Sequence, residues 1–309
     1  MLKKILFVTD PWKTLDHAND TTLRMMHEFD SKGALVFWCD LSCLVRTPSE
    51  VLVRVQRYKN GRRRTAHRLR PSVFSQIHYR VDPPIESSYI AGLQTLAESA
   101  KPGSIVNPPE LLLMHSEKTL ASILGLGHLA PKTWVLSTAS ELAPLFRQNR
   151  TLVIKPLYSA QSKGVHLLNQ KNHLKIFKQI SQNETRAVVI QEFLPLVQKN
   201  GETRLWFVDG NLIGYCQKHA KNGDFKIDMD HGGSASAVTL NQLQKKTATQ
   251  IGRALRKYRI RLAAVDLIQK KSSYVITDFN ITSPGLLTTI EKIMGENLAA
   301  IIAQTLLRR

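Results

Sequence analysis

The chain has 309 residues and a formal net charge of +19, from 43 Lys and Arg against 24 Asp and Glu. Hydrophobic residues make up 43% of it, enough to bury a core, which excludes the disordered and collagen-like classes. The length exceeds the usual size of a single-core domain, so we expect two or three lobes with an active site between them. The positive charge should attract anions and leaves nucleic acid, an acidic membrane face, or a nucleotide with an acidic peptide as partner classes.

The cysteines and the hydrophobic segments indicate in which cellular compartment we expect the protein. Cys39, Cys43 and Cys216 are too few for a disulfide framework, and Cys39 with Cys43 has no second pair to complete a zinc site. The N-terminal apolar run ends at Val8, too early for a signal sequence. No segment approaches the roughly 18 apolar residues of a membrane span. We therefore predict reduced thiols and a cytoplasmic protein without membrane contact.

Short apolar runs and one helical segment organise the first third of the chain. Residues 5–8 form an apolar run that ends at Asp-Pro, residues 21–29 are expected to form a helix capped by Asp20, and residues 34–38 form a second run. This order predicts an α/β lobe with a parallel sheet. Ligands bind where such strands end. Two later segments repeat the plan of an apolar strand followed by a proline-stiffened loop, at 77–81 and 104–106.

The densest basic stretch lies between Arg54 and Arg70 and includes Arg62, Arg63 and Arg64. As a solvated loop or helix face, such a run needs no ligand. The alternative is a surface that binds nucleic acid, in which case neutralising these three arginines would remove a salt-sensitive affinity.

The rest of the chain predicts mixed α+β structure. A helix is expected around 116–126. Four short strands are expected at 133–136, 152–155, 165–168 and 187–191. Asp209-Gly210 between two alternating segments is a strong hairpin signal. The last third predicts a helix at 240–258, strands at 262–268 and 274–279, and a terminal helix from about residue 297.

Compact nucleotide and hydrolase motifs do not explain the chain. It contains no P-loop, no Gly-x-Ser-x-Gly elbow and no His-Glu-x-x-His. Residues 125–130 match the short dinucleotide fingerprint in letters, but they follow a predicted helix and lack the preceding strand. If the protein is an enzyme, its chemistry must be spread over separate strands.

Three oxygen-bearing side chains near the C-terminus suggest a metal site. Period-two geometry places Asp278 and Asn280 on one face of a strand. If the strand of Asp266 pairs beside it, the three side chains form a hard site for Mg²⁺ that still needs phosphate oxygens. The alternative is that they are solvent-facing residues of a half-exposed sheet.

Several charged residues could meet the phosphates of a nucleotide. Lys155 ends an apolar strand, where a buried ammonium is costly unless a phosphate meets it, and Lys118 lies at a helix start. Taken singly, each is better explained by a surface position. In the segment 191–204, the backbone could bind an adenine edge and Glu202 the ribose hydroxyls, while Arg204 would face phosphate charge.

Taken in order, these pieces resemble bacterial glutathione synthetase, of the ATP-grasp superfamily, over nearly the whole chain. The matching segments are Val8-Thr-Asp-Pro11, Arg80-Val-Asp-Pro-Pro84, Ile105-Val-Asn-Pro-Pro109 with Glu117-Lys118, Val153-Ile-Lys-Pro-Leu157, Gln191-Glu-Phe-Leu-Pro195, Arg204 with Val208-Asp-Gly210, Tyr215-Cys216, Gly232-Gly233, Asp266-Leu-Ile268 and Asn280-Ile-Thr-Ser-Pro284.

The resemblance implies an N-terminal α/β substrate-binding domain over 1–115, an ATP-grasp small (lid) lobe over 116–200, and a C-terminal lobe with the metal site over 201–309. It implies ATP and Mg²⁺ or Mn²⁺ as cofactors. Its expected partners are small acidic peptide and amino-acid substrates and further copies of the chain. The implied activity is phosphorylation of a peptide carboxylate by ATP, followed by attack of an amine on the acyl phosphate; for glutathione synthetase the substrates are γ-glutamylcysteine and glycine.

The same resemblance assigns the site residues. Arg204 is implied as the catalytic residue that faces the reacting phosphate. The residues implied to bind ATP are Lys118, Lys155, Gln161, Gly164, Gln191, Glu192, Leu194 and Glu202. Those implied to bind substrate are Arg80, Lys226, Asp228 and Ser283. Those implied to bind metal are Asp266, Asp278 and Asn280.

The chain departs from the family pattern at several places. The loop at 158–164 keeps one glycine where the family has several, and Gln161 with Gly164 gives it some likeness to ligases that add glutamate to a ribosomal protein. Asp278 replaces a Glu. Other replacements are Lys226 for Arg, Asp228 for Asn, and Thr288-Thr289 for a polar or charged pair. Two alternatives therefore stay open: a ligase with another acceptor, such as glutamate addition, and a non-catalytic basic nucleotide- or nucleic-acid-binding paralogue.

Overall fold

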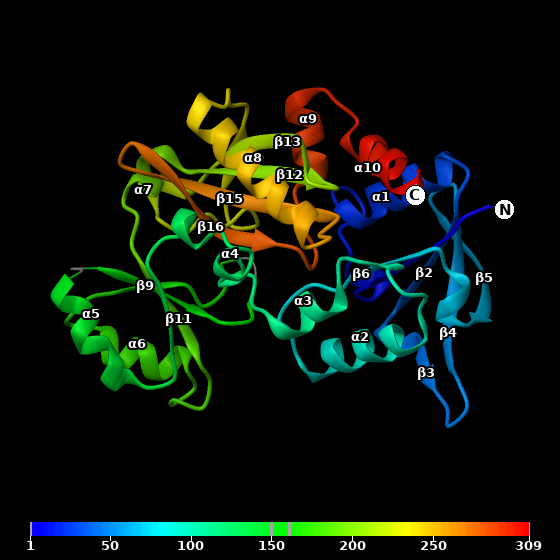
Figure 1. The fold of residues 1–309 in the computed structure, drawn as a ribbon, viewed down its shortest axis with the longest axis horizontal. Coiled ribbons are helices and arrows are strands. Elements are labelled where there is room, and N and C mark those ends of the chain that lie inside the picture. Colours follow the sequence, from blue (N-terminus) through cyan, green and yellow to red (C-terminus); the bar gives the residue numbers. More distant parts are fainter. Residues whose placement is uncertain (1, 149–150, 160–161, 309) are drawn as a thin grey trace.

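The computed structural model describes residues 2–148, 151–159 and 162–308. In Figure 1 the chain forms three lobes, each built around its own sheet: the N-terminal lobe (blue to cyan), a second lobe (green), and a C-terminal lobe (olive to red). No helix among the described residues has both the length and the apolar character needed to cross a membrane.

The N-terminal sheet is parallel at its centre, as predicted. Its parallel strands are β1 (Lys4–Thr9), β2 (Leu35–Asp40), β6 (Gln76–Arg80) and β7 (Ile105–Val106). They lie in the order β2-β1-β6-β7. The predicted helix is α1 (Thr21–Ser31), and the Asp20 carboxylate caps it by accepting from Leu23 N at 2.8 Å.

The basic stretch at 54–70 is neither a loop nor a helix face, so that expectation is wrong. It forms β4 (Val51–Lys59) and β5 (Arg62–Leu69), an antiparallel pair that extends the sheet beyond β2 together with β3 (Leu44–Arg46). Asn60 and Gly61 turn the chain with φ of 50° and 75°, the backbone that Asn-Gly favours in a two-residue hairpin. Val51, Val53 and Val55 alternate into the core. In the sequence, the positive charge of this stretch obscured both the Asn-Gly turn and the alternation of the valines.

The second lobe holds the four predicted strands in one antiparallel sheet, ordered β10-β9-β11-β8. The strands are β8 (Thr133–Leu136), β9 (Leu152–Pro156), β10 (His166–Leu168) and β11 (Val188–Glu192). Helices α5 (Leu142–Gln148) and α6 (His173–Ile180) cover it. Phe146 and Phe177 pack on Ile154 and Ile190 in a core whose members all lie between residues 134 and 190.

The C-terminal lobe is a five-stranded antiparallel sheet with helices on both faces. Its strands, in the order β14-β13-β12-β15-β16, are β12 (Glu202–Val208), β13 (Asn211–His219), β14 (Ser234–Ser236), β15 (Leu262–Lys270) and β16 (Ser273–Asn280). The predicted Asp209-Gly210 hairpin joins β12 to β13. The helices are α8 (Gln242–Lys257), α9 (Leu287–Met294) and α10 (Leu298–Leu307). Leu205 and Phe207 face α8, whereas Trp206 and Val208 face α9 and α10.

Shorter helices connect these elements, together with the longer α2, which was not predicted. The α-helices are α2 (Ser87–Ser99), α3 (Pro109–Met114), α4 (Leu120–Ile123) and α7 (Leu196–Asn200). The 3₁₀ helices are η1 (Trp12–Thr14), η2 (Leu41–Cys43), η3 (Pro71–Val73), η4 (Gly127–Leu129), η5 (Ala139–Glu141) and η6 (Lys221–Gly223).

The N- and C-terminal lobes share one hydrophobic core. Met25 and Phe29 of α1 belong to the same buried cluster as Ile302 and Leu306 of α10. Gln76 of β6 reaches the end of α10, where its Nε2 donates to Leu306 O at 2.6 Å. The terminal helix therefore fixes the two lobes to each other.

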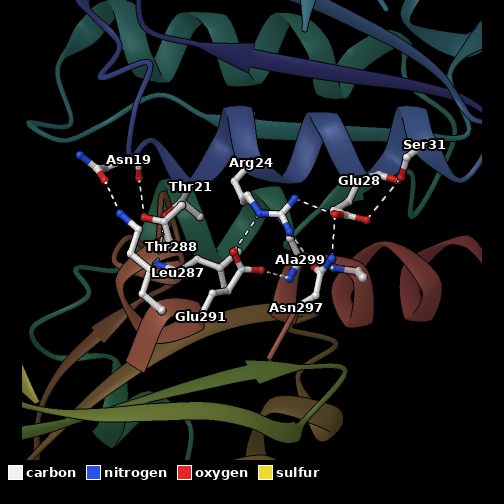
Figure 2. Close-up of polar contacts among 12 residues, drawn as sticks. Asn19, Thr21, Arg24, Glu28, Ser31, Leu287, Thr288, Glu291, Asn297 and Ala299 are labelled. Atoms are coloured by element: carbon white, nitrogen blue, oxygen red, sulfur yellow. Dashed lines mark hydrogen bonds and ion pairs between the residues drawn. The ribbon is translucent and has the colours of Figure 1, made fainter. Parts of the chain in front are cut away.

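A polar network at the edge of this core joins α1 to α9 and α10 (Figure 2). The Arg24 guanidinium donates to Glu291 Oε2 at 2.8 Å, Glu28 Oε1 at 2.7 Å and Asn297 Oδ1 at 2.8 Å. Glu291 Oε1 accepts from Ala299 N at 2.8 Å. One arginine thus neutralises two largely buried carboxylates from different lobes.

Replacing Arg24 by Met is expected to lower the free energy of unfolding by about 3 kcal/mol, because it leaves Glu28 and Glu291 buried without a counter-charge. Urea denaturation measures the effect. Arg24→Lys, which keeps one charge, is the control and should lose less; a loss below about 1 kcal/mol for Arg24→Met, as for an exposed pair, would contradict the prediction.

His78 of β6 is a second titratable group inside this core. Its ring stacks on Phe7 with centroids 4.5 Å apart, and its Nε2 faces Gln76 Oε1 at 3.3 Å. Because the Gln76 amide nitrogen is committed to Leu306 O, this oxygen is the acceptor and Nε2 carries the proton. His78 Nδ1 is buried without a partner in the described residues. Burial, aided by the charges of Arg80 and Arg261, holds the pKa of His78 well below its ordinary value.

The pKa of His78 predicts loss of stability in acid. The unfolded chain takes up a proton below about pH 6.5 and the folded chain does not, so stability is intact above that pH and falls below it by up to about 1.4 kcal/mol per pH unit. Urea denaturation at pH 7.5, 6.5 and 5.5, compared with His78→Phe, isolates this group because other titrations cancel. A difference between the two proteins that does not change with pH would refute the assignment.

Candidate active site

A cleft of about 720 Å³ lies where the three lobes meet. The loops after β1 and β6 supply Asp10 and Asp82, β9 and β11 supply Lys155 and Gln191, and the C-terminal sheet supplies most of the remaining charged wall. The predicted site residues that line it are Arg80, Lys118, Lys155, Gln191, Glu192, Leu194, Glu202, Arg204, Lys226, Asp228, Asp266, Asp278, Asn280 and Ser283. Residues far apart in the sequence therefore meet in one cavity.

Arg204 and Asp266 form the centre of the charged wall. Strands β12 and β15 pair with these residues directly opposite each other. Arg204 donates from Nε to Asp266 Oδ1 at 2.9 Å and from Nη2 to Oδ2 at 2.7 Å, a bidentate pair. Burial opposes the charged carboxylate, but Arg204 and Lys218 hold the pKa of Asp266 well below its usual range. The carboxylate therefore stays ionised.

Lys218, on β13, is a buried cation that the sequence analysis missed. Its Nζ forms ion pairs with Glu202 and, at 3.3 Å, with Asp266 Oδ1. A regular hairpin at Asp209-Gly210 would put Gln217 opposite Glu202, but an irregularity after Trp206 shifts the register and brings Lys218 there. Burial raises the pKa of Glu202, while the nearby cations oppose that rise.

Asp278 and Asn280 lie on β16 beside this pair. Both line the cleft, as their period-two spacing predicts, and Asp278 is directly opposite Asp266. Asp278 Oδ1 is buried and accepts no hydrogen bond from the described part of the chain. Asn280 commits its amide nitrogen to Ala264 O at 3.2 Å, so its oxygen is the atom available to a ligand.

These oxygen atoms suit a hard cation such as Mg²⁺. An ionised carboxylate has about four acceptor positions, and the contacts of Asp266 with Arg204 and Lys218 use three of them. In the described ranges, no group of three or more His, Cys, Asp or Glu side chains could hold a metal by itself. Mg²⁺ prefers six oxygen ligands and commonly shares them with phosphate and water. The orphan oxygen of Asp278 fits that arrangement.

Two lysines face this wall from the second lobe. Lys155 Nζ donates to Gln191 Oε1 at 3.0 Å, and Gln191 is held in turn by Thr133 Oγ1 at 3.0 Å. Burial lowers the pKa of Lys155. Lys118 Nζ donates to Ser159 O at 2.6 Å, so it also contacts the loop at 158–164. Both ammonium groups are placed to bind an anionic ligand.

Glu192 and Leu194 lie where the chain passes from the second lobe to the C-terminal lobe. The Glu192 carboxylate accepts from Lys132 N at 2.9 Å and pairs with Lys270. The Glu192 carboxylate is therefore engaged in contacts within the protein. Leu194 is buried against Ile268. Glu192, Phe193 and Leu194 all line the cleft.

The loop at 158–164 touches the opposite wall. Ser162 Oγ donates to Ile227 O at 3.1 Å. Gly164 has φ of 71°, and a Cβ there would lie 2.6 Å from Pro156 Cγ, so this glycine is required by the close packing of the loop on β9. Gly164 does not line the cleft, although Ser162 and Lys163 do. Gln161 lies outside the described residues.

The predicted substrate residues occupy two walls of the cleft. Arg80 is buried, and donates from Nε to Thr22 Oγ1 at 2.8 Å and from Nη2 to Pro284 O at 2.9 Å. Burial lowers its pKa. Ser283 contacts Arg80 O at 3.5 Å, whereas Lys226 and Asp228 lie on the segment that contacts Ser162. Arg80 and Ser283 therefore lie together, and all four residues line the cleft.

Two further features were not predicted. Asp10, Asp16, Asp20 and Asp82 give the cleft an acidic end, and burial, with the charges of Asp10 and Asp20, raises the pKa of Asp82. Glu117 Oε1 accepts from Ile281 N, Thr282 N and Thr282 Oγ1 at 2.6 to 3.0 Å, fixing the chain after Asn280. In the sequence, the only sign that Glu117 matters is its position directly before Lys118.

The cleft therefore has two chemically different ends. Three cations lie near the oxygen ligands of β15 and β16: Arg204 pairs with Asp266, Lys155 interacts electrostatically with Asp266 and Asp278, and Lys118 lies close to Lys155. Lys163 lines the same cleft. This combination suits the phosphates of a nucleoside triphosphate bound with a divalent cation. The acidic end suits a group that carries an ammonium.

Comparisons with known proteins identify the family. The family model for the N-terminal domain of prokaryotic glutathione synthetase matches residues 3–112, and that for its ATP-grasp domain matches residues 118–295. Glutathione synthetase of Prochlorococcus marinus subsp. pastoris is 27% identical over 98% of this chain and 99% of its own length.

Solved structures agree on the fold. A crystal structure of D-cycloserine synthetase superposes with a TM-score of 0.73 at 16% identity, covering 99% of both chains. An ATP-grasp ligase solved with a precursor-peptide variant, Mg and ADP superposes with a TM-score of 0.63 at 12% identity, over 100% of this chain and 99% of that one. The predicted fold class is therefore confirmed. The chain belongs to the prokaryotic glutathione synthetase family and is an ATP-grasp ligase, an enzyme that uses ATP with Mg²⁺ to form a C–N bond.

Proposed function

We propose that the chain is a glutathione-synthase-like ligase that joins γ-glutamylcysteine to glycine and converts ATP to ADP and phosphate. The observation that carries the proposal is the pairing of Arg204 with Asp266 beside the open oxygens of Asp278 and Asn280, in a cleft that all three lobes line. Family membership over nearly the whole chain supports the choice of substrates.

Three segments of the chain have different roles in this function. Residues 1–115 bind the peptide, residues 116–200 form the lid over the nucleotide, and residues 201–309 hold the metal and the reacting phosphate. The contact of Ser162 with Ile227 supports the lid role, since it joins the loop of the second lobe to the C-terminal lobe across the cleft. A closed cleft would keep water from the acyl phosphate.

The nucleotide lies along the second and third lobes in this proposal. Lys118 and Lys155 bind phosphates, with Gln191 orienting Lys155. The backbone at Glu192 and Leu194 receives the adenine, Glu202 the ribose, and the loop with Gln161 and Gly164 covers the phosphates. Asp266, Asp278 and Asn280 hold Mg²⁺, which neutralises phosphate charge when bound.

Two steps follow from this placement. The peptide carboxylate attacks the terminal phosphorus of ATP, ADP leaves, and an acyl phosphate remains. The glycine amine then attacks the carbonyl carbon, loses a proton and expels phosphate. Arg204 and Lys155 neutralise the charge that moves with the phosphoryl group. The protein acts by positioning and charge and forms no covalent bond to the substrate.

At the far end of the cleft, the peptide meets Arg80, Ser283, Lys226 and Asp228. Arg80 acts there mainly by shaping the wall, because two of its nitrogens are committed to Thr22 and Pro284. The carboxylates at this end match the α-ammonium of a γ-glutamyl group. These small peptide and amino-acid molecules are the proposed substrates.

A second candidate is an ATP-grasp ligase with another acceptor. Thr288 is buried, its hydroxyl donating to Asn19 O at 2.9 Å, so it offers no charge to a substrate carboxylate, and Thr289 lines the cleft with a neutral side chain. The loop with a single glycine favours the same candidate.

Asp278→Asn is expected to abolish most of the Mg²⁺-dependent affinity for ATP, by about 100-fold, because it removes the charge of a carboxylate whose Oδ1 is buried without a partner in the described residues. Calorimetric titration of ATP with and without Mg²⁺ measures this directly. Glu296→Gln removes the same charge at an exposed site and is the control. Unchanged Mg²⁺-dependent affinity in Asp278→Asn would remove Asp278 from the metal site and favour a non-catalytic nucleotide-binding role.

Substrate identity is tested by ADP release against a panel of γ-glutamyl dipeptides, other peptides and amino acids. We expect turnover to require both γ-glutamylcysteine and glycine, and Arg204→Met to lower kcat by at least about 100-fold while ATP still binds. Mass spectrometry of the product identifies the new bond. Turnover with other acceptors but not with glycine would establish the second candidate instead.

A further inference from the structure

The connection from the N-terminal lobe to the second lobe holds a distant part of the chain in place. It covers residues 107–119, between β7 and α4. Its first residue, Asn107, and its Glu117 both form hydrogen bonds with the backbone of Ile281 in the C-terminal lobe. Figure 1 shows α4, which follows the connection, beside β16, the strand that ends just before Ile281. The connection is therefore also a contact with the C-terminal lobe.

Residues 281–285 follow β16 directly and line part of the cleft. Beyond Asn280 the backbone leaves the sheet, so its N–H and C=O groups need other partners. Glu117 Oε1 accepts from Ile281 N at 2.6 Å, and from the amide and hydroxyl of the next residue at 2.8 and 3.0 Å. Asn107 Nδ2 donates to Ile281 O at 2.6 Å. These two side chains therefore fix the chain immediately after Asn280.

The far end of the same segment is held by other residues. Arg80 Nη2 donates to Pro284 O at 2.9 Å, and Trp206 Nε1 donates to Gly285 O at 2.9 Å. The two donors come from β6 and β12 and not from the connection. The position of the segment at the substrate end of the cleft is therefore set by contacts other than those of Glu117.

The residues on either side of Glu117 contact the second lobe. Ser116 Oγ donates to Leu157 O at 2.5 Å, and Lys118 Nζ donates to Ser159 O at 2.6 Å. Of three consecutive side chains, the outer two bind the loop after β9, and the middle one binds the chain after β16. Glu117 therefore joins two walls of the cleft.

The need to pair backbone groups does not by itself account for a carboxylate at this position. Asn107 shows that a neutral side chain can serve, since it forms four hydrogen bonds with backbone groups. Glu117 instead places a negative charge in a cleft suited to phosphates, where the charge of Asp278 also repels it. In return, a charged acceptor makes each hydrogen bond about twice as strong. A carboxylate is therefore favoured if the chain after β16 must be held firmly.

We propose that Glu117 is a positioning residue of the ligase, which keeps Asn280 and Lys118 in a fixed relative position. The inference rests on the proposed function, in which Asn280 binds Mg²⁺ and Lys118 binds a phosphate of ATP. Glu117 directly precedes Lys118 and binds the two residues that follow Asn280, so no flexible segment separates the two. A metal and a phosphate bound there would keep the relative position that phosphoryl transfer needs.

Two substitutions separate the reach of this side chain from its charge. Glu117→Gln keeps an acceptor oxygen at the same distance from the backbone, whereas Glu117→Asp keeps the charge on a side chain that is shorter by a methylene. Calorimetric titration of ATP with and without Mg²⁺ should show about 30-fold weaker Mg²⁺-dependent affinity in Glu117→Asp. Glu117→Gln should stay within about threefold of the unmodified enzyme. Equal losses in the two variants, or no loss in Glu117→Asp, would overturn the proposal.

Hydrogen exchange of the ligand-free enzyme gives a readout that does not depend on turnover. The amides of Ile281 and Thr282 should exchange about tenfold faster in Glu117→Asp than in Glu117→Gln, because they lose their acceptor. Arg24→Met is the control, since it lowers stability outside the cleft and should leave the Mg²⁺-dependent affinity unchanged. An equal loss of affinity in this control would assign the effect to general destabilisation and refute the positioning role.

Turnover separates this inference from the proposed function. In ADP release, Glu117→Asp should lower kcat by about 30-fold and change the KM for the peptide by less than about threefold, because Arg80 holds Pro284 independently. A rise in KM without a fall in kcat would contradict the role. If the unmodified enzyme does not turn over γ-glutamylcysteine with glycine, the proposed substrates are wrong, while the ATP affinities of the variants still decide the role of Glu117.

Discussion

The register of β15 between β12 and β16 is the constraint on which the site depends. It sets Asp266 opposite Arg204 on one side and opposite Asp278 on the other. A carboxylate this buried stays charged only because two cations surround it, and those cations are fixed by the same backbone hydrogen bonds. A slip of one residue in either pairing would turn these side chains to the opposite face of the sheet. The positions of Arg204, Asp266 and Asp278 relative to one another therefore depend on the pairing of the whole sheet.

Much of the fold follows from the sequence because its strands are short apolar runs ended by turn residues. The parallel strands, the second-lobe strands and the Asp209-Gly210 hairpin were predicted within a few residues. The basic hairpin was missed because its charge outweighed the Asn60-Gly61 turn and the alternating valines. Local pattern predicts an element well where one signal dominates, and poorly where charge and periodicity disagree.

The site was harder to predict than the fold. Period-two spacing placed Asp278 and Asn280 on one face, but no pattern places Lys218, since its position depends on an irregularity inside β12 and β13. Glu117 acts across more than 160 residues on the backbone of Ile281 and Thr282, a contact that leaves no trace in local sequence. The side chains of Glu192 and Arg80 contact neighbours within the protein, and no local pattern in the sequence indicates these contacts.

The second lobe differs from the other two in how it is attached. The core around Phe146 and Phe177 uses residues of that lobe alone, whereas the other two large clusters mix the first and last thirds of the chain. Such a division makes separate cooperative units: the fused N- and C-terminal lobes open together, and the second lobe can open locally at lower free energy. A ligand bound between the two units would couple their opening. Occupancy of the cleft would then slow amide exchange in the second lobe, although the ligand does not contact the core of that lobe.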